Sequence, residues 1–438
     1  MPRNLYYVDS VYRAGGDDNP SGGYVTLINT KPDKEGRFLP MTLPFRLQLT
    51  FPEGGLVEED YFVFFIRHRA GENPVLRNAN NTPEAIRFAE EAAQAQAVMQ
   101  DRSKSSETSE LTSHEKEVLE GDPEVFSYHV NVGHGNCSLI LISGKKGYFL
   151  WMVDCSTVEG LPNPRRWIRH YRDLDICLQD IAKKVKTAVN KLKISRFFLT
   201  HLHYDHYNGM FYLQKKGFID NTTVYYINMF FSCKNPALTK LINNPKVCAV
   251  VKEPIAGKAG NLPLTILHPE CRVYRKGDPK AKHVANKREV KNVNNASVVY
   301  CFNLGGHSMV FPGDLEKDGF DAMTTLKKCS ANLHYAQYYV VSHHGSINGH
   351  PDHPCLGTKH HPTPLACVDN HLQKALLLGR DKAYPTIFDP SVVSFFKRLL
   401  VTTDRVNRKR SFKYFRLRWS TGMCFIDIKY HTAARQLL

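Results

Sequence analysis

The stretch from Ile194 to Gly209, ISRFFLTHLHYDHYNG, joins a short apolar run to a group of potential metal ligands. The apolar run predicts a strand that ends at Thr200. Four metal-binding side chains follow within six positions: His201, His203, Asp205 and His206. Imidazole and carboxylate groups are ligands of zinc and similar ions, so the stretch predicts a metal site.

The local backbone decides whether these side chains can meet. Successive side chains of a strand point to opposite faces, so a strand alone cannot aim all four at one ion. A strand that ends in a loop and a helix can, with His201 and His203 leaving from one face. Asp205 and His206 would then lie in the first helical turn. The alternative is a histidine-rich surface loop, which matching stretches downstream disfavour.

Length and composition indicate a globular protein. The chain has 438 residues, which predicts two domains or one large domain with additions. The first residues, MPRNLYYVDS, lack the apolar run of a signal peptide, and no apolar segment is long enough to span a bilayer. The 11 cysteines are scattered without a CxxC pair, which is typical of reduced thiols. We therefore expect a cytoplasmic protein that does not bind membranes.

The charge balance favours a polyanionic partner. Lys and Arg number 58 against 42 Asp and Glu, a formal net charge of +16. Such a balance suits nucleic acid binding. A basic enzyme with no polymeric substrate is the alternative.

Sequence patterns predict three parts. Residues 1–78 contain β-branched and aromatic runs separated by Gly, Pro, Asn and Asp, and so form a β-rich module. Residues 79–123 hold a helix, starting near Thr82, and a polar, Ser-rich stretch that we interpret as a mobile linker or an exposed helix. Docking of this whole part as a helical hairpin is the alternative. Residues 124–438 alternate strands and helices, which predicts a domain of the α/β class.

Three further stretches carry candidate site residues at predicted strand ends. Asp314 follows an apolar strand and a Pro-Gly pair, where a carboxylate could bridge two ions and a glycine permits a tight bend. His343 and His344 end the strand in YYVVSHHGSING. Asn136 leaves a glycine-containing bend in NVGHGNCSLI. A site at one edge of a β-sandwich requires residues placed in this way.

With these motifs in this order, the sequence resembles the metallo-β-lactamase fold, and more narrowly its ComEC-like branch, the hydrolase domain of DNA-uptake competence proteins. The HxHxDH motif matches His201–His206, the strand-Gly-Asp ligand matches Asp314, and HHGS matches residues 343–346. VGHGN, VDCS, LHP and NNASVV match further family segments. The resemblance covers about residues 125–430. It implies an αββα sandwich, with the β-rich module and helical linker as N-terminal additions.

Two departures leave the number of metal ions open. Many members of the wider fold have another histidine between HxHxDH and the aspartate, and the candidates here are His268, His283 and His307. Near the end the family often has a histidine before a proline, where this chain has Tyr384. Tyrosine is a poorer zinc ligand, so one of His343 and His344 would serve instead.

A second group of histidines and cysteines lies in GHPDHPCLGTKHHPTPLAC, residues 349–367. A separate structural zinc site is one interpretation. We favour a stiff loop beside the active site, because the spacing fits no standard zinc finger and prolines recur.

The resemblance assigns roles to these residues. The expected ligands of one or two Zn²⁺ ions, or of Mn²⁺, are His201, His203, Asp205, His206, Asp314 and His343 (or His344). Such a metal lowers the pKa of bound water to about 7, which supplies a hydroxide for attack on carbonyl or phosphorus. Asp205 would orient the water, and the remaining histidine of the His343/His344 pair would donate a proton to the leaving group. Thr200 and Ser342 would fix imidazole tautomers, and Asn136 would line the site.

A nucleic acid is the expected substrate. The ComEC-like branch is associated with nuclease activity, and a basic C-terminal segment alternates with aromatic residues that suit a single-stranded groove. Its cations are Arg405, Arg408, Lys409, Arg410, Lys413, Arg416 and Arg418. A strand with one basic face is the alternative for that segment. For the protein, the alternatives are a hydrolase of a small ester, lactone or cyclic nucleotide, and a catalytically weak scaffold that binds nucleic acid or a partner. Because a free nuclease is hazardous, we also expect a regulatory protein partner or an activating signal.

Overall fold

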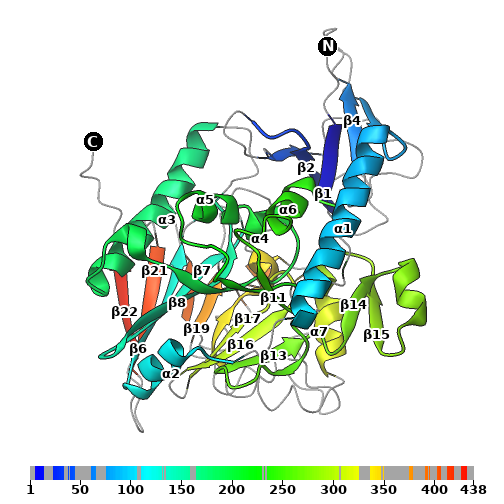
Figure 1. Ribbon diagram of the computed structural model, residues 1–438. Helices are drawn as coiled ribbons and strands as arrows, with labels where there is room; N and C mark the ends of the chain where they lie inside the picture. The colour runs from blue at the N-terminus through cyan, green and yellow to red at the C-terminus, as the bar shows by residue number, and fades with distance from the viewer. Residues whose placement is uncertain are drawn as a thin grey trace. The chain divides into compact units, whose positions relative to one another are not determined.

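The computed structural model has the mixed α/β class that the sequence predicts (Figure 1). It describes residues 5–13, 23–33, 38, 40–44, 61–65, 75–105, 110–130, 132, 135–157, 164–228, 231, 234–304, 307–324, 336–346, 349, 374–377, 390–392, 394, 402–405, 412–418 and 426–431. No helix in this described part combines the length and the apolar character that crossing a bilayer requires.

The chain divides into two compact units. The smaller unit contains residues 1–101, 160–164 and 232–245. The larger unit contains residues 102–159, 165–231 and 246–438. The smaller unit is thus assembled from segments that are distant in the sequence. The three sequence-based boundaries, 1–78, 79–123 and 124–438, stay a prediction.

The smaller unit holds one antiparallel sheet in the order β3-β2-β1-β4-β5. Its strands are β1 (Leu5–Arg13), β2 (Gly23–Asn29), β3 (Pro40–Pro44), β4 (Tyr61–Phe65) and β5 (Val75–Asn78). Most of α1 (Pro83–Ser105) and all of α6 (Pro236–Ile242) belong to it as well. Asn235 caps α6 and donates a hydrogen bond of 3.1 Å to buried Asp9 on β1. That bond ties residues 232–245 to the N-terminal sheet.

The larger unit contains two main sheets. The first has the order β11-β10-β9-β8-β7-β6-β21-β22. Its strands are β6 (Glu124–Val130), β7 (Cys137–Gly144), β8 (Gly147–Cys155), β9 (Ile194–Phe198), β10 (Val224–Tyr226), β11 (Val250–Lys252), β21 (Phe412–Arg418) and β22 (Ile426–His431). The second has the order β12-β13-β16-β17-β18-β19-β20. Its strands are β12 (Gly257–Lys258), β13 (Leu264–His268), β16 (Val299–Leu304), β17 (His307–Phe311), β18 (Ala336–Val340), β19 (Lys374–Leu377) and β20 (Thr402–Arg405).

The two sheets pack face to face through aromatic side chains. Trp151 and Phe198 of the first sheet meet Phe302 of the second, with ring centroids 6.0 Å and 5.1 Å apart. All three rings are buried. Because the side chains of a strand alternate between its faces, every second residue of β8, β9 and β16 reaches this interior. Each ring contributes about 1.5–3 kcal/mol by leaving water.

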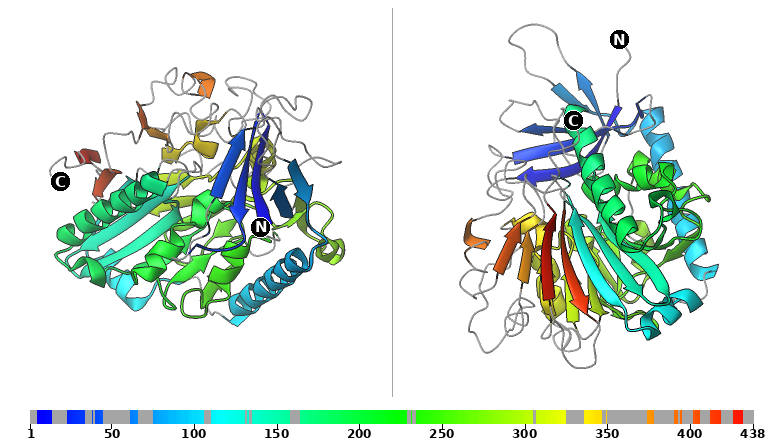
Figure 2. Two further views of the ribbon diagram at one scale, coloured as in Figure 1. Left: turned by 90° about the horizontal axis from the view of Figure 1, so that it is seen from above. Right: turned by 90° about the vertical axis from the view of Figure 1, so that its left-hand side faces the viewer.

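Helices cover the sheets on the outside. Helix α3 (Pro164–Lys184) runs along the first sheet (Figure 2) and buries Leu174, Leu178 and Ile181. Its Asp180 accepts a hydrogen bond of 3.1 Å from the Tyr128 hydroxyl on β6. Helix α7 (Lys317–Thr324) contacts β13 of the second sheet. Strand β7 is consequently buried on both faces, which explains its nearly continuous apolar sequence.

Helix α2 (Ser113–Glu120) is docked against β7 and β8, although its polar composition had favoured a linker or an exposed helix. Thr112 and Glu115 form a capping box, in which each side chain accepts a hydrogen bond from the other residue's backbone N–H. The Glu115 carboxylate also accepts hydrogen bonds from Trp151 Nε1 (2.9 Å) and from Arg196 Nε and Nη2 (3.0 and 2.6 Å). The buried ion pair to Arg196 on β9 anchors the helix, an arrangement that composition cannot reveal.

Strand direction brings the ends of several strands to common edges. Strands β8 and β9 are parallel, so Asp154 near the end of β8 lies beside Thr200 just after β9. Strands β17 and β18 are also parallel, and they end just before Asp314 and His343. The carboxyl ends of parallel strands lie at the same sheet edge, which places each pair of segments together.

Candidate metal centre

Asp154 organises the loop that follows β9. Its carboxylate accepts hydrogen bonds of 2.8 Å from both the backbone N–H and the hydroxyl of Thr200. Its Oδ2 lies 2.8 Å from Nδ1 of His206, and both side chains are fully buried. An imidazole that donates through Nδ1 to a carboxylate exposes Nε2 as a ligand, which is the usual support of metal-binding histidines.

His201 and His203 form the first part of the centre. Both are buried, and Nε2 of His201 lies 3.1 Å from Nδ1 of His203. Burial lowers the pKa of both imidazoles, to about 4 for His203 and well below the ordinary value for His201. Both rings are therefore neutral at pH 7, the state in which imidazole binds a metal.

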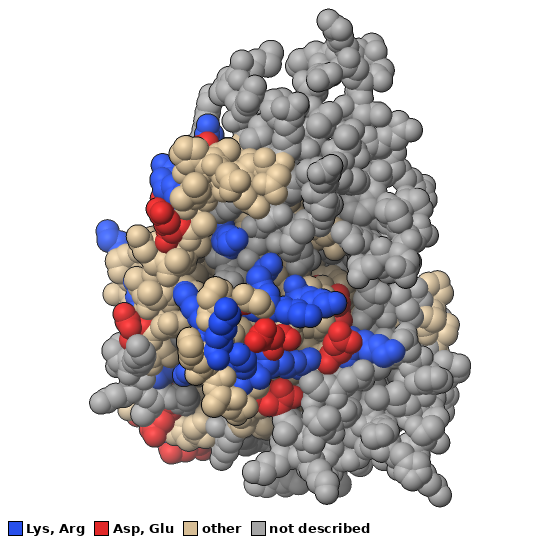
Figure 3. All heavy atoms as spheres, turned by 90° about the vertical axis from the view of Figure 1, so that its right-hand side faces the viewer, with Lys and Arg blue, Asp and Glu red and all other residues tan. Residues whose placement is uncertain are grey.

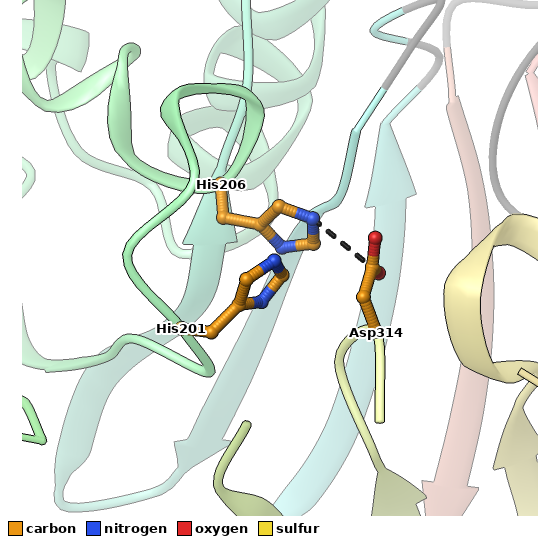
Figure 4. A group of neighbouring side chains, drawn as sticks. All are labelled: His201, His206 and Asp314. Carbon is orange, nitrogen blue, oxygen red and sulfur yellow. Dashed lines mark ion pairs between the residues drawn. The ribbon is translucent and has the colours of Figure 1, made fainter. Parts of the chain in front are cut away.

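The short helix α4 (Tyr204–Tyr207) presents the next two residues, with His203 at its N-cap. Asp205 and His206 lie in its single turn, as the strand–loop–helix interpretation requires. The Nε2 atom of His206 lies 3.4 Å from Oδ1 of Asp314, the pair marked in Figure 4. It also lies 3.8 Å from Oδ2 of Asp205.

Asp314 reaches the centre because a glycine precedes it. Gly313 has a φ of 61°, and a Cβ atom there would lie 2.6 Å from Cβ of Thr200. Only glycine combines this backbone conformation with so close an approach. Gly313 also accepts a hydrogen bond of 3.1 Å from the backbone N–H of His343. The glycine therefore joins the ends of β9, β17 and β18.

His343 and His344 both have left-handed backbone conformations, with φ of 47° and 52° in η4 (Ser342–Gly345). Two successive non-glycine residues in this region are strained, and such strain concentrates at functional sites. The turn aims His344 Nε2 at the cluster, 3.4 Å from Asp314 Oδ2 and 3.7 Å from Asp205 Oδ2. The side chain of His343 is 17% exposed, with Nε2 3.8 Å from Asp314 Oδ2.

Two overlapping groups of buried side chains could hold a metal ion. One is His201, His206 and Asp314, and the other is Asp205, His206 and His344. Within each group, one potential ligand atom per residue lies within 4.8 Å of the others. His203 and His343, which the sequence placed among the ligands, are in neither group. In place of His343, the geometry favours His344.

The polar atoms of the centre fit a metal ion. His206 Nε2 and Asp314 Oδ1 are buried and have no hydrogen-bond partner within the described residues. Leaving buried polar atoms unsatisfied costs about 1–3 kcal/mol each, so native proteins usually pair them. Two ligands at about 2.0–2.1 Å from a tetrahedral zinc ion lie roughly 3.3 Å apart. The observed separation of 3.4 Å matches that spacing.

The electrostatics of the cluster favour positive charge. Burial opposes protonation of His344, but the carboxylates of Asp314 and Asp205 outweigh it and raise its pKa to about 9. Burial likewise opposes charge on His206, yet nearby carboxylates, Asp314 first, raise its pKa well above the ordinary value. Burial acts to raise the pKa of Asp314, and the surrounding imidazoles lower it well below its usual range. The carboxylates that stabilise the protonated imidazoles would also attract a bound cation.

The remaining predicted site residues lie close by. Asn136 is 6% exposed and follows Gly135, at which a Cβ would lie 2.0 Å from the backbone oxygen of Asp205. Gly135 therefore packs against the metal-site helix. The Ser342 hydroxyl donates to the backbone oxygens of Gly313 and Leu315. Ser342 thus holds the Asp314 loop through these backbone oxygens, and not an imidazole as the sequence predicted.

His268 was a candidate for the third ligand position, but its ring makes other contacts. Its Nδ1 lies 2.7 Å from the Ser297 backbone oxygen, and its Nε2 lies 2.8 Å from Arg288 Nη1. Burial, with a further contribution from Arg288, lowers its pKa to about 3. Both ring nitrogens are therefore engaged away from the cluster. His283 is exposed in η2 (Pro279–His283), and the side chain of His307 lies outside the described residues.

Several sequence predictions fall outside the described residues. Tyr384 and the histidine- and cysteine-rich residues 350–367 lie there. So do Arg408, Lys409 and Arg410 of the basic C-terminal segment. The backbones of Arg405 on β20 and of Lys413, Arg416 and Arg418 on β21 are described, without their side chains. Their predicted contact with nucleic acid stays a prediction.

Two residues of the centre were not singled out from the sequence. Asp154 lay in the VDCS segment, and an aspartate that ends a long apolar strand was the available signal. Glu316 lies two residues after Asp314, with its Oε1 3.9 Å from Nδ1 of His343. It accepts hydrogen bonds from the side chains of Asn292 (2.8 Å) and Asn294 (3.0 Å). Nothing local to DLEKDG marks Glu316 as a site residue.

No protein-family model matches the chain, and a search of curated proteins finds no significant match. Any statement of function therefore depends on the residues of the centre.

Proposed function

We propose that the protein is a metal-dependent hydrolase of the metallo-β-lactamase type, and that it cleaves phosphodiester bonds in DNA or RNA. The observation that carries the proposal is the buried pair of His206 Nε2 and Asp314 Oδ1. These atoms lie 3.4 Å apart without hydrogen-bond partners in the described part of the chain. A metal ion bound between these two buried atoms would satisfy both, and their separation matches that of two ligands of one ion.

The arrangement of the layers supports this proposal. Two sheets pack through Trp151, Phe198 and Phe302, with α3 along one sheet and α7 beside the other. An αββα sandwich has this arrangement, and the order of the motifs along the sequence resembles the ComEC-like branch. Both the HxHxDH segment and the Asp314 segment follow strands at a sheet edge, where that type of fold carries its site.

The residues present would suit one or two zinc or manganese ions. His201, His206 and Asp314 would provide one set of ligands, with His203 beside His201, and Asp205, His206 and His344 would provide the other. Asp314 lies beside both, because its two oxygens approach His206 and His344 at 3.4 Å. A bound ion would supply Lewis acidity and a water of lowered pKa.

The chain's own residues would prepare the site and move a proton. Asp154 holds the His206 ring so that Nε2 faces the cluster. His343 remains partly exposed beside Asp314, outside both metal-binding groups, and is available to donate a proton to a leaving group. Glu316 Oε1 lies 3.9 Å from the opposite ring nitrogen, Nδ1, of His343.

Metal analysis combined with nucleic acid cleavage tests the proposal. Full-length protein would be assayed for bound metal and for cleavage of labelled single- and double-stranded DNA and RNA with Zn²⁺ or Mn²⁺. The Asp205→Ala/His206→Ala variant should lose cleavage by more than about 100-fold, since loss of supporting groups alone costs 10–100-fold. His114→Ala is the matched control, because it removes an exposed imidazole on α2, away from the centre.

Two results would contradict the proposal. If wild-type protein with bound metal cleaves none of the four nucleic acids, the proposal that DNA or RNA is the substrate is wrong. A parallel assay with a small aryl ester and a cyclic nucleotide would then show whether the centre serves another hydrolysis. If the double variant cleaves as well as wild type, the catalytic centre lies elsewhere.

A further inference from the structure

A strongly basic lobe is inserted between β13 and β16 of the larger unit. It comprises residues 272–291 and contains β14 (Arg272–Arg275), β15 (Lys287–Val290) and η2. The two strands pair in parallel. Eight basic residues occupy it: Arg272, Arg275, Lys276, Lys280, Lys282, Lys287, Arg288 and Lys291. Its acidic residues are Asp278 and Glu289. Lys and Arg side chains gather over the middle of the molecular face in Figure 3, the face that carries β14 and β15 in Figure 1.

Three lysines of the lobe point to solvent. Lys276, Lys282 and Lys291 are exposed, and none of the three forms an ion pair with a described residue. Arg275, Lys287 and Arg288 are half-buried, and Val273 and Tyr274 are at most 4% exposed. Arg272 is paired with Glu253 at 2.9 Å and Lys287 with Glu289 at 3.2 Å, so the free charge is concentrated on the three exposed lysines.

The lobe is attached to the metal centre at two points. Arg288 on β15 donates a hydrogen bond of 2.8 Å to the Asp318 backbone oxygen, four residues after Asp314. Directly after the lobe, Asn292 donates to the Glu316 carboxylate at 2.8 Å. Glu316 in turn lies 3.9 Å from His343. These hydrogen bonds join the lobe to the segment that carries Asp314 and Glu316, so phosphates bound on the lobe would lie on the same part of the larger unit as the centre.

We propose that this basic lobe binds the sugar-phosphate backbone of the nucleic acid on which the centre acts. The inference rests on the proposed function and names the surface that holds the polymer. Unpaired lysines attract phosphates and release the counterions that surround them. The metal centre by itself handles one phosphodiester, whereas the lobe adds sequence-independent affinity along the strand.

The composition of the lobe disfavours two other modes of binding. Its one Phe, Tyr or Trp residue, Tyr274, is buried, and the imidazole of His283 is the lobe's exposed ring, so base stacking would be limited to one position. Its apolar residues Val273, Ala281 and Val290 are buried, Val284 is half-buried and Ala285 is small, so the lobe lacks the broad exposed apolar face by which a basic segment enters a bilayer. The lobe should hence bind single strands and duplexes without sequence preference, through their phosphates.

Charge reversal tests the inference. The Lys276→Glu/Lys282→Glu/Lys291→Glu variant would be compared with Lys145→Glu/Lys191→Glu/Lys215→Glu, which makes the same charge change at exposed lysines elsewhere. Binding of fluorescein-labelled single-stranded and duplex DNA would be followed by anisotropy from 50 to 300 mM salt. Each variant would also be made in the Asp205→Ala/His206→Ala background, so that cleavage does not consume the probe.

The lobe variant should bind DNA at least about tenfold more weakly than the control variant at low salt, with a slope of log K against log salt reduced by about 2 to 3. A Lys→Gln version of the lobe variant should show a smaller loss in the same direction. Circular dichroism would verify that each variant is folded. Equal affinity of the lobe and control variants would overturn the inference. So would binding of the wild type to phosphatidylserine vesicles in preference to DNA.

The outcomes separate this inference from the proposed function. If the wild type cleaves DNA and the lobe variant binds it as tightly as the control, the function stands and the lobe is not the docking surface. If neither protein cleaves DNA but only the lobe variant loses binding, the docking surface is supported and the nuclease proposal fails.

Discussion

Oδ2 of Asp154 lies 2.8 Å from Nδ1 of His206, and neither side chain is exposed to solvent. Asp154 has a φ of 51°, which is unusual for a non-glycine residue. The same carboxylate binds the Thr200 backbone N–H and hydroxyl. One residue at the end of β8 therefore sets both the loop after β9 and the ring orientation of a proposed ligand.

Replacing Asp154 should weaken metal binding without removing a ligand. In Asp154→Asn the amide can donate to the His206 nitrogen and so favours the wrong tautomer. We expect zinc affinity to fall about 10- to 100-fold. Chelator competition would measure it, with Glu117→Gln, an exposed carboxylate on α2, as control. Unchanged zinc affinity in a folded Asp154→Asn protein would refute the orienting role.

His343 and His344 should separate metal binding from proton transfer. His344→Ala should lose bound metal together with activity, because His344 Nε2 belongs to a metal-binding group. His343→Ala should keep its metal and lose about 10²- to 10⁴-fold in kcat, the usual contribution of a general acid. Metal content and turnover of the two variants, measured side by side, provide the test. The reverse pattern would exchange the two roles.

The ion pair between Glu115 and Arg196 should be essential for stability. Both side chains are 2% exposed, and their closest atoms lie 2.6 Å apart. Removing one partner of a buried pair leaves a charge without compensation and costs about 3–5 kcal/mol. Arg196→Met should therefore reduce the free energy of unfolding by that amount in urea titrations. The exposed pair of Lys146 and Glu120 offers a control. Lys146→Met should change the free energy of unfolding by less than about 1 kcal/mol. Equal losses in the two variants would contradict the assignment.

The same pair predicts how stability depends on acid. Burial acts to raise the pKa of Glu115, but the hydrogen-bonded Arg196 guanidinium outweighs it, so the pKa lies below the ordinary value. A lowered folded-state pKa stabilises the protein at pH values above the unfolded-state pKa of about 4.3. That contribution is lost as the pH falls from there through the folded-state pKa. Urea unfolding between pH 7 and pH 3 should show this loss in wild type and a smaller loss in Glu115→Gln. If the free energy of unfolding falls equally with pH in wild type and in Glu115→Gln, Glu115 does not contribute to the loss of stability in acid.

The sequence carried enough information to place most of the metal centre. The apolar run before His201 specifies a strand by local preference, and the loop and helix after it follow from the need to bring four closely spaced ligands together. The glycine before Asp314 and the histidines after a β-branched run likewise mark strand ends. Such features depend on neighbours in the chain, so they can be recognised without the fold.

Tertiary packing decided what local preference cannot. The parallel pairing of β17 with β18 placed the His343/His344 turn against Gly313, and the left-handed turn aimed His344 at Asp314. His268 was a candidate ligand by type and order, yet Ser297 and Arg288 occupy both its nitrogens. The polar segment around Glu115 became buried because Arg196, 81 positions later, neutralises its charge. Burial and pairing of charges depend on residues far apart in the sequence, and only the folded chain brings them together.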